Sequence, residues 1–463
     1  MTRDGLGLLA ANACFLAAGA GLSRPLGLWR SPHELPAVLA VAYVAGVAAV
    51  GIGATLLLLA GLALTVWQVL LLCALLAAAG FLPVSLGASL DAPLPSTRSV
   101  RRLAAAVAAL LGIYLLGLLA RSWYEPLFHW DAWAMWTLKA RAIVLLDGLD
   151  LRVFAADAYR SLHLDYPLFV PALEAIDFRF MGRIDTRVVD AQFWFLFVGF
   201  LGAAAQLLRD RVQAVVLWPA LLLLGIAPSL AIQLRWSIAD FPLALFFGLA
   251  GLAGWRYLES GRAPFAALLA LFGGAAWATK REGLAFVVLL YVVLLVFALV
   301  RRAPVVPLVL AGAASLVAIL PWRIWVRAHD LEPAELPLGK AVNPSYLLDR
   351  TDRVGPALSG LAEQAFKPGW WLAVLPLFLV ATALALRSRN GRPLGIFVLC
   401  LVGLMFASLL WAYWGDRPEI DQHVAHTARR VVTSALVVSG LFLPLLAAQL
   451  GRHEPQSRDL SKE

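Results

Sequence analysis

The sequence predicts an all-α protein that crosses a membrane many times, and three observations lead to this class. Of the 463 residues, 61% are hydrophobic and only 14% are charged, whereas soluble domains have about 45–50% and about 25%. Apolar runs recur along the whole chain, and each is long enough to cross the hydrocarbon core as a helix. The runs are continuously apolar, which excludes the alternating strands of a membrane β-barrel.

About thirteen segments have the length that a transmembrane helix needs. Their ranges are 5–22, 36–59, 62–82, 103–120, 188–208, 212–232, 238–257, 264–279, 283–300, 304–326, 370–386, 393–413 and 431–450. No clear cleavage site follows the first run, so we expect a retained helix and not a signal peptide. The three cysteines lie inside apolar runs, and neither a disulfide framework nor a metal site is expected.

Arginines gather in alternate connections between the runs, which predicts the orientation. One side of the membrane receives Arg24, Arg30, Arg98, Arg101, Arg102, Arg209, Arg211, Arg256, Arg262, Arg301, Arg302, Arg387, Arg389, Arg392, Arg452, Arg458 and Lys462. The positive-inside rule makes this side the cytoplasm. We therefore expect a multi-pass protein of the cell membrane, in bacteria the inner membrane. The net charge of +9 forms no single basic patch, so no nucleic-acid partner is expected.

This orientation divides the chain into parts with different roles. Residues 1–102 are expected to supply additional N-terminal transmembrane helices, 103–450 a catalytic core, and 451–463 a cytoplasmic tail. The hydrophilic segments 121–187 and 327–369, with the shorter 415–430, fall on the extracytoplasmic side. Chemistry is expected at that face, in contact with membrane lipids.

Asp131 is the first candidate for chemistry. It directly follows a predicted span and precedes 132–146, where Trp133, Trp136 and Ile143 recur at helical spacing, as in an amphipathic helix that lies in the membrane interface. A carboxylate at this level could serve as a general base. Two purely structural interpretations stay open. In one, Asp131 is the N-cap of the following helix; in the other, the tryptophans are ordinary interfacial anchors.

Thr279-Lys280-Arg281-Glu282-Gly283 forms a second candidate site, in a tight connection between two apolar runs. Two adjacent cations at the membrane edge are costly without an anion nearby, and a lipid phosphate would satisfy them. Snorkelling of both cations to ordinary headgroups is the alternative.

Further candidates lie at other span ends on the same side. Arg429 and Arg430 open the last span, and Lys139 and Arg141 on the interfacial helix are second-choice contacts for a phosphate. Acceptor or secondary-site candidates are His163, Asp165, Tyr166, Asp240 and Glu282. His423 and His426 have the spacing of metal ligands but lack an obvious fourth ligand, so we expect no metal site.

The order of these short motifs resembles the GT-C superfamily of membrane glycosyltransferases that use polyprenyl-phosphate sugars, such as protein O-mannosyltransferases and the aminoarabinose transferase of lipid A. In that pattern an acidic residue after a span precedes interfacial helices and a proline-containing apolar stretch. The matching segments here are Asp131, 132–146, Asp165-Tyr166-Pro167, Ala239-Asp240-Phe241-Pro242, Thr279-Lys280-Arg281-Glu282-Gly283 and Arg429-Arg430. The resemblance covers roughly residues 103–450.

The resemblance implies a GT-C-like bundle with an active site at the extracytoplasmic face. It implies inverting transfer of a sugar from a polyprenyl-phosphate donor to a hydroxyl of a glycan, lipid or protein acceptor, with no other cofactor. Asp131 would be the base, and Lys280, Arg281, Arg429 and Arg430 would bind the donor phosphate. A carrier that moves a lipid or sugar across the bilayer without chemistry is the alternative, and such a carrier is expected to have broken or charged helices near the midplane.

The predicted orientation can be tested by cysteine labelling in intact cells. A single cysteine introduced at position 157 should react with a membrane-impermeant thiol reagent, and one at position 458 should not, because the arginine-rich side is retained in the cytoplasm. The opposite labelling pattern would invert the orientation and move every candidate site to the cytoplasmic side.

Overall fold

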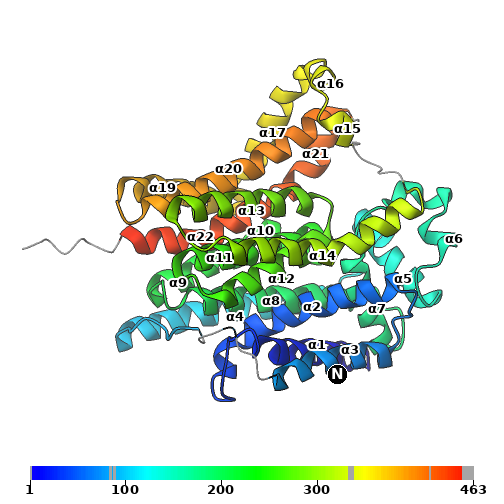
Figure 1. Cartoon of the computed structure of the whole chain (residues 1–463), viewed down its shortest axis with the longest axis horizontal. Helices are drawn as coiled ribbons and strands as arrows, with labels where there is room; N and C mark the ends of the chain where they lie inside the picture. Colours follow the sequence, from blue (N-terminus) through cyan, green and yellow to red (C-terminus); the bar gives the residue numbers. More distant parts are fainter. Residues whose placement is uncertain (1–2, 83–85, 87–89, 332–337, 417–418, 451–463) are drawn as a thin grey trace, which may run out of the picture.

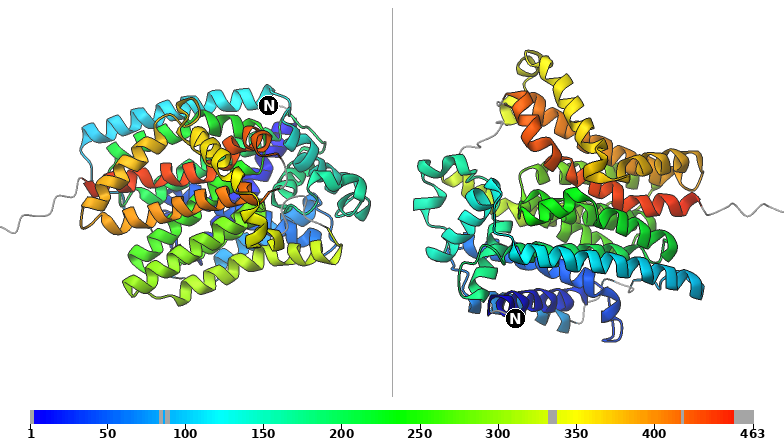
Figure 2. Two further views of the ribbon diagram at one scale, coloured as in Figure 1. Left: turned by 90° about the horizontal axis from the view of Figure 1, so that it is seen from above. Right: turned by 180° about the vertical axis from the view of Figure 1, so that it is seen from behind.

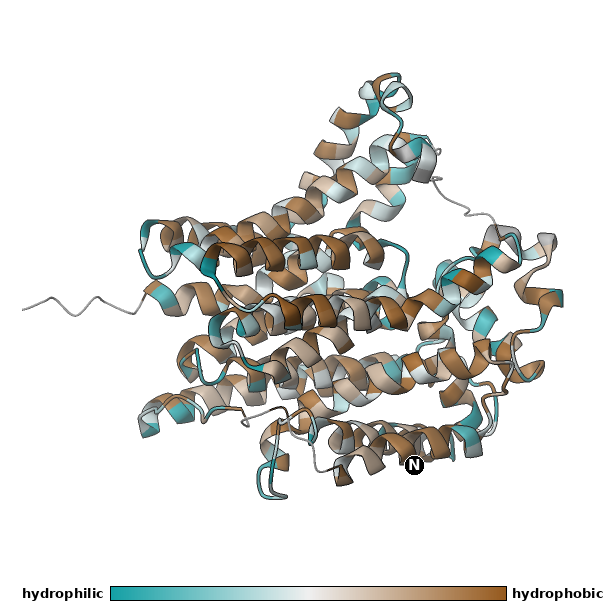
Figure 3. Cartoon of the chain, in the orientation of Figure 1, coloured by the Kyte–Doolittle hydropathy of each residue, from teal (hydrophilic) through white to brown (hydrophobic). Residues whose placement is uncertain are grey.

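A computed structural model describes residues 3–82, 86, 90–331, 338–416 and 419–450, and these are helical with no strand among them. Long helices run side by side through the body of the molecule, while short helices gather at one end and form a protruding lobe (Figure 1). Two further views show the same short helices at that end (Figure 2). Colouring by hydropathy places hydrophobic residues along the long helices and most hydrophilic residues near their ends (Figure 3).

Nine helices in the described part of the chain are long and apolar enough to cross a membrane. They are α1 (Arg3–Ser23), η1 with α2 (Leu35–Leu59), α4 (Arg98–Tyr124), α8 (Asp190–Leu208), α11 (Asp240–Ser260), α13 (Glu282–Arg301), α14 (Val306–Ala328), α20 (Arg392–Gly415), and α21 with α22 (Ile420–Leu450). A tenth candidate is the pair α9 (Ala214–Gly225) and α10 (Pro228–Arg235), which is bent by 52°. The chain is therefore a polytopic helical membrane protein.

The predicted number of thirteen spans is not confirmed. The ranges 62–82, 264–279 and 370–386 contain shorter apolar helices, α3 with η2 (Val66–Phe81), α12 (Ala263–Thr279) and α19 (Val374–Arg387). Local structure shortens two of them. Thr65 forms a capping box with Gln68 that starts α3 late, and Leu372 has a φ of 54° just before α19 begins.

Close helix packing holds the body together. Every residue of α11 from Asp240 to Leu258 is buried, so this helix lies at the centre of the bundle. Near one edge, α1 and α2 touch backbone to backbone, because a Cβ at Gly19 would lie 1.8 Å from the carbonyl oxygen of Ala42 and one at Gly46 would lie 1.8 Å from that of Phe15. Small residues at such contacts permit the dispersion-driven association typical of membrane helices.

The segment 121–187 is folded into short helices. A π-helix (Ala132–Trp136) leads into α5 (Thr137–Leu145), followed by α6 (Leu151–Phe154), a 3-10 helix (Asp157–Leu162) and α7 (Phe169–Met181). Trp136 and Lys139 are fully buried. The 132–146 stretch therefore packs against the bundle with one face, which an interfacial helix lying only on lipid would not do.

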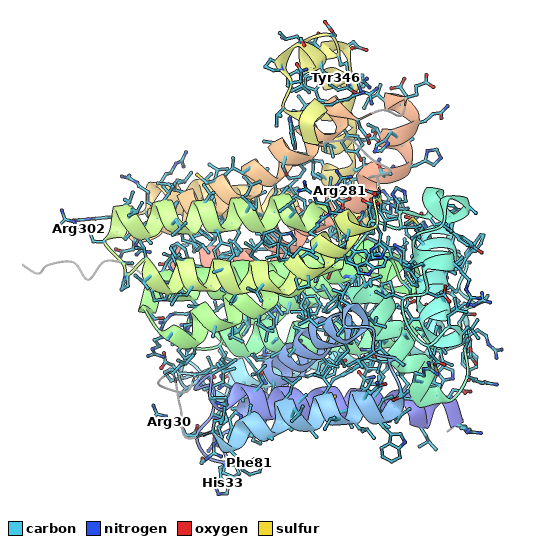
Figure 4. The ribbon with its side chains drawn as sticks, turned by 45° about the vertical axis from the view of Figure 1, so that its right-hand side comes forward. Arg30, His33, Phe81, Arg281, Arg302 and Tyr346 are labelled. Carbon is cyan, nitrogen blue, oxygen red and sulfur yellow. The ribbon has the colours of Figure 1, made fainter. Side chains whose placement is uncertain are left out.

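The expected loops 327–369 and 415–430 are also largely helical where described. They contribute α15 (Leu338–Ala341), α16 (Pro344–Leu348), α17 (Val354–Phe366) and α21 (Ile420–Val431), which form the protruding lobe of Figure 1, and α18 (Pro368–Trp371), which lies beside α10. The helix that carries the last span therefore starts at Ile420, while its apolar part, α22 (Thr433–Leu450), begins close to the predicted residue 431. In Figure 4, Arg281 and Tyr346 lie toward the lobe, while Arg30 and Arg302 lie at the opposite end of the bundle.

Candidate functional site

An ion pair between Asp131 and Arg430 forms the centre of the candidate site. Nη1 of Arg430, on α21, donates to Oδ2 of Asp131, which precedes the π-helix. Both side chains are mostly buried. The Asp131 side chain makes no capping hydrogen bond to the following helix. The N-cap reading of this residue is therefore wrong, because its carboxylate is used for a contact with a helix 299 positions away in the sequence.

Lys280 lies next in the site and is already neutralised. Its Nζ is 2.9 Å from Oδ1 of Asp240 and 2.7 Å from Oε1 of Glu282. Lys280 and Asp240 are both buried. Burial alone would lower the pKa of Lys280, but the carboxylates of Asp240 and Glu282 outweigh it and raise this pKa above its ordinary value. The structure thus joins three sequence-predicted residues into one compact charge cluster at the start of α13.

Arg429 differs from its neighbour Arg430 in having no acidic partner among the described residues. Its guanidinium carbon lies 4.3 Å from the centroid of the Trp236 ring and 4.5 Å from that of Trp370, so two indole rings hold it. No hydrogen bond or ion pair reaches this guanidinium from the residues that the structure describes. His129, two residues before Asp131, stacks on the same Trp236 ring at 4.3 Å.

A second cluster surrounds Lys139. This fully buried lysine donates from Nζ to the carbonyl oxygen of His163 at 2.6 Å, and its Nζ lies 5.6 Å and 5.9 Å from the rings of Trp136 and Tyr166. Burial lowers the pKa of Lys139 to about 7, although Asp165 opposes the shift. The sequence prediction of a phosphate contact at Lys139 is therefore poorly supported, because its ammonium group is enclosed by protein.

The remaining candidates are more scattered. Arg141 is exposed on the helix that buries Lys139. Arg281 lies between the two charge-bearing residues Lys280 and Glu282, at the end of the bundle that carries the lobe (Figure 4). His423 approaches Asp416 at 3.6 Å, while Nδ1 of His426 contacts a backbone carbonyl. Among the described residues no three His, Cys, Asp or Glu side chains are grouped as metal ligands would be.

Sequence reasoning missed Trp236 and Trp370 as site residues, because tryptophans near span ends are typical interfacial anchors. It also missed Glu174 and Asp177 on α7. These two carboxylates are buried, and none of their oxygens has a hydrogen-bond partner in the described structure. Two acids at i, i+3 spacing inside the apolar stretch 168–181 were the available signal.

Burial gives this acid pair unusual proton affinity. It raises the pKa of Glu174 to about 8, against a smaller opposing contribution from the hydroxyl of Thr137. It also raises the pKa of Asp177 well above its ordinary value, and the charge of Glu174 adds to that shift. A pKa of about 8 favours the protonated form of Glu174 at neutral pH, because an unpaired buried carboxylate is much more costly than a buried neutral acid.

Comparisons of the chain with protein-family models, curated proteins and solved structures found no match. The site geometry therefore carries the functional argument that follows.

We predict that the stability of the protein falls as pH rises, because of Glu174. The folded-state pKa of about 8 exceeds the ordinary value of 4.5, so the folded protein holds an extra proton between these values. The associated stability is complete below pH 4.5 and is lost as pH rises toward 8, at about 1.4 kcal/mol per pH unit. Thermal unfolding in detergent should therefore show a midpoint that decreases from pH 5 to pH 8.

Glu174→Gln should make this pH dependence shallower and raise the midpoint at pH 8. Glu363→Gln is the matched control, because Glu363 is largely exposed on α17. An equal pH dependence in wild type and Glu174→Gln would show that Glu174 keeps an ordinary pKa.

Proposed function

We propose that the chain is a membrane glycosyltransferase that transfers a sugar from a polyprenyl-phosphate donor to an acceptor hydroxyl with inversion. The proposed site lies at the lobe end of the bundle, which positive-inside orientation makes extracytoplasmic. The acceptor would be the hydroxyl of a glycan, lipid or protein. No cofactor beyond the lipid-linked donor is required by this proposal.

The observation that carries the proposal is the contrast between Arg429 and its neighbours. Arg430 and Lys280 are neutralised by carboxylates, whereas Arg429 is held between two indole rings without an acidic partner in the described structure. An Arg guanidinium donates readily to phosphate oxygens, and a fixed one loses little entropy on binding. Arg429 is therefore suited to hold an anion directly beside the Asp131–Arg430 pair.

In the proposed reaction, the donor phosphate binds Arg429 and competes with Asp131 for Arg430. The released Asp131 carboxylate accepts the proton of the acceptor hydroxyl while that oxygen bonds to the anomeric carbon. The bond from the anomeric carbon to the phosphate oxygen breaks, and its electron pair leaves with the polyprenyl phosphate. Arg429 and Arg430 stabilise the negative charge that develops on this leaving group. Attack opposite the leaving group accounts for inversion.

Lys280 has a different part in this proposal from the one that the sequence indicated. Two carboxylates occupy its ammonium group, so a phosphate would have to displace them. We assign it to positioning: it holds Asp240 and Glu282 beside the site. Arg281 remains a proposed phosphate contact, and Asp165, Tyr166 and His163 remain proposed acceptor-side residues around Lys139.

A carrier without chemistry is the second candidate, and two observations favour it. The α9–α10 pair is bent by 52°, and the buried acids Glu174 and Asp177 lie on α7, which is packed within the bundle. Broken helices and buried ionisable groups are expected of membrane carriers. A carrier leaves its cargo chemically intact, so neither the wild-type chain nor a variant of Asp131 would cleave the donor. Neutralising Glu174 and Asp177 together would abolish transport.

Asp131→Asn is predicted to lower sugar transfer by about 10² or more, because the amide cannot accept the acceptor's proton. Donor binding should be at least as tight as in the wild type, since Arg430 is released from its ion pair with Asp131. Turnover and donor binding by purified protein measure the two effects separately. Asp147→Asn is the matched control, because Asp147 pairs with Arg179 in the same segment but is mostly exposed. A fully active Asp131→Asn enzyme would exclude Asp131 as the base.

Arg429→Gln is predicted to weaken binding of polyprenyl phosphate by about tenfold or more, since a charge-assisted hydrogen bond contributes about 1.5–3 kcal/mol. Binding to purified protein can be measured directly. Lys367→Gln is the control, because Lys367 lies 5.8 Å from the ring of Trp370 without belonging to the proposed site. Equal affinities of the wild type and Arg429→Gln for polyprenyl phosphate would show that Arg429 does not bind the donor phosphate.

A further inference from the structure

A groove opens at the end of the bundle that carries Arg30 and Arg302, away from the candidate site (Figure 4). This end is called the arginine-rich end. It lies between α4, α8 and α9 and has a volume of about 570 Å³. Its walls are mainly small residues, with Ala104 and Ala108 on α4 facing Gly202 and Ala205 on α8. Small side chains on both walls leave space for an elongated apolar group between the two helices.

Two cations, Arg101 and Arg209, also line this groove. Arg101 lies near the start of α4, and Arg209 directly follows the last residue of α8. The start of α4 and the end of α8 lie close together, because the amide of Leu94, just before α4, donates to the carbonyl oxygen of Arg209, and Figure 1 shows α4 beginning at the end of the bundle away from the lobe. The groove therefore has charge at the membrane edge and an apolar wall toward the membrane interior.

Arg209 is a cation whose acidic neighbour is already occupied. Asp210 receives two hydrogen bonds from Arg256, at 2.6 Å and 2.5 Å. The Nε atom of Arg209 is buried without a hydrogen-bond partner, and no ion pair reaches its guanidinium from the described residues. A partly buried guanidinium in this state is stabilised by an anion from outside the chain.

The groove is held in shape by a backbone contact, and its α4 side is open to lipid. The amide of Leu94 donates to the carbonyl oxygen of Arg209 at 2.9 Å, which fixes the segment that enters α4 over the mouth of the groove. Along its span α4 is the least buried of the nine candidate helices, and Leu103 and Leu110 on it are exposed. A lipid of the adjacent leaflet can therefore enter from the side.

We infer that this groove binds one anionic phospholipid of the leaflet at the arginine-rich end. Its phosphate lies on Arg209 and Arg101, and one acyl chain lies along the small-residue walls of α4 and α8. The charge of the two arginines and the apolar length of the groove match the two parts of such a lipid. The site is separate from the proposed glycosyl-transfer site and does not depend on that proposal.

Native mass spectrometry of the purified full chain tests the inference with dioleoyl phosphatidylglycerol, which is anionic, and dioleoyl phosphatidylcholine, which has the same chains without net charge. Both lipids carry an anionic phosphodiester, but the choline cation of the second offsets this charge and is repelled by the two arginines, so the first should bind about tenfold more tightly. Dihexanoyl phosphatidylglycerol should bind weakly, since it lacks the chain that fills the groove. Equal binding of the two dioleoyl lipids would overturn the inference.

Variants locate the bound lipid. The Arg101→Gln/Arg209→Gln pair should lose the preference for phosphatidylglycerol, and Ala105→Trp should reduce its binding by filling the groove while both cations remain. Arg98→Gln/Arg102→Gln removes the same charge from exposed positions of α4 and should keep the preference. Unfolding midpoints measured without added lipid identify any variant that is misfolded. Ala105→Trp then tests whether the lipid occupies the groove, because this variant keeps both arginines.

Two results would overturn the assignment. An equal loss of preference in the control pair would mean that phosphatidylglycerol only senses surface charge. If polyprenyl phosphate bound this groove more tightly than phosphatidylglycerol, the ligand of the groove would be another lipid phosphate and not a phospholipid.

Discussion

The ion pair between Asp131 and Arg430 is the contact on which the rest of the candidate site depends. It joins the segment after α4 to the start of the last span, across 299 positions of sequence, and brings Arg429 beside His129 through the ring of Trp236. A charge that is buried without a partner is costly. The pair therefore fixes two distant parts of the chain together, and the adjacent Arg429 has no acidic partner in the part of the chain that the structure describes.

The cost of an unpaired charge in the protein interior also explains why the buried ionisable groups have different partners. Lys280 is paired with carboxylates and Arg256 with Asp210, while Glu174 has no cationic partner among the described residues and burial raises its pKa, which favours the neutral acid. Each solution removes net charge from the interior. Arg429 and Arg209 depart from this pattern at opposite ends of the bundle. We propose that an external anion completes the balance at both places, a donor phosphate at Arg429 and a phospholipid headgroup at Arg209.

Sequence reasoning predicted the helical membrane class because the length of an apolar run can be read from the local sequence without knowledge of tertiary packing. It also predicted that Asp131, Asp240, Lys280 and Arg430 belong to one region, since positive-inside orientation places their span ends on a common side. It could not predict which cation is neutralised, because that depends on packing between helices far apart in sequence. The thirteen-span count failed to be confirmed where caps and bends, such as those at Thr65 and Leu372, interrupt apolar runs.

Release of polyprenyl phosphate is the measurement that tests the central claim most directly. Membranes with the wild-type chain, its Asp131→Asn variant or neither would receive polyprenyl-phosphate hexose and pentose donors labelled in the lipid, together with unfractionated envelope acceptors. The account predicts that at least one donor releases polyprenyl phosphate only with the wild-type chain. Absence of release with every donor, or equal release by the Asp131→Asn variant, would contradict it, and movement of an intact donor across the membrane would establish the carrier instead.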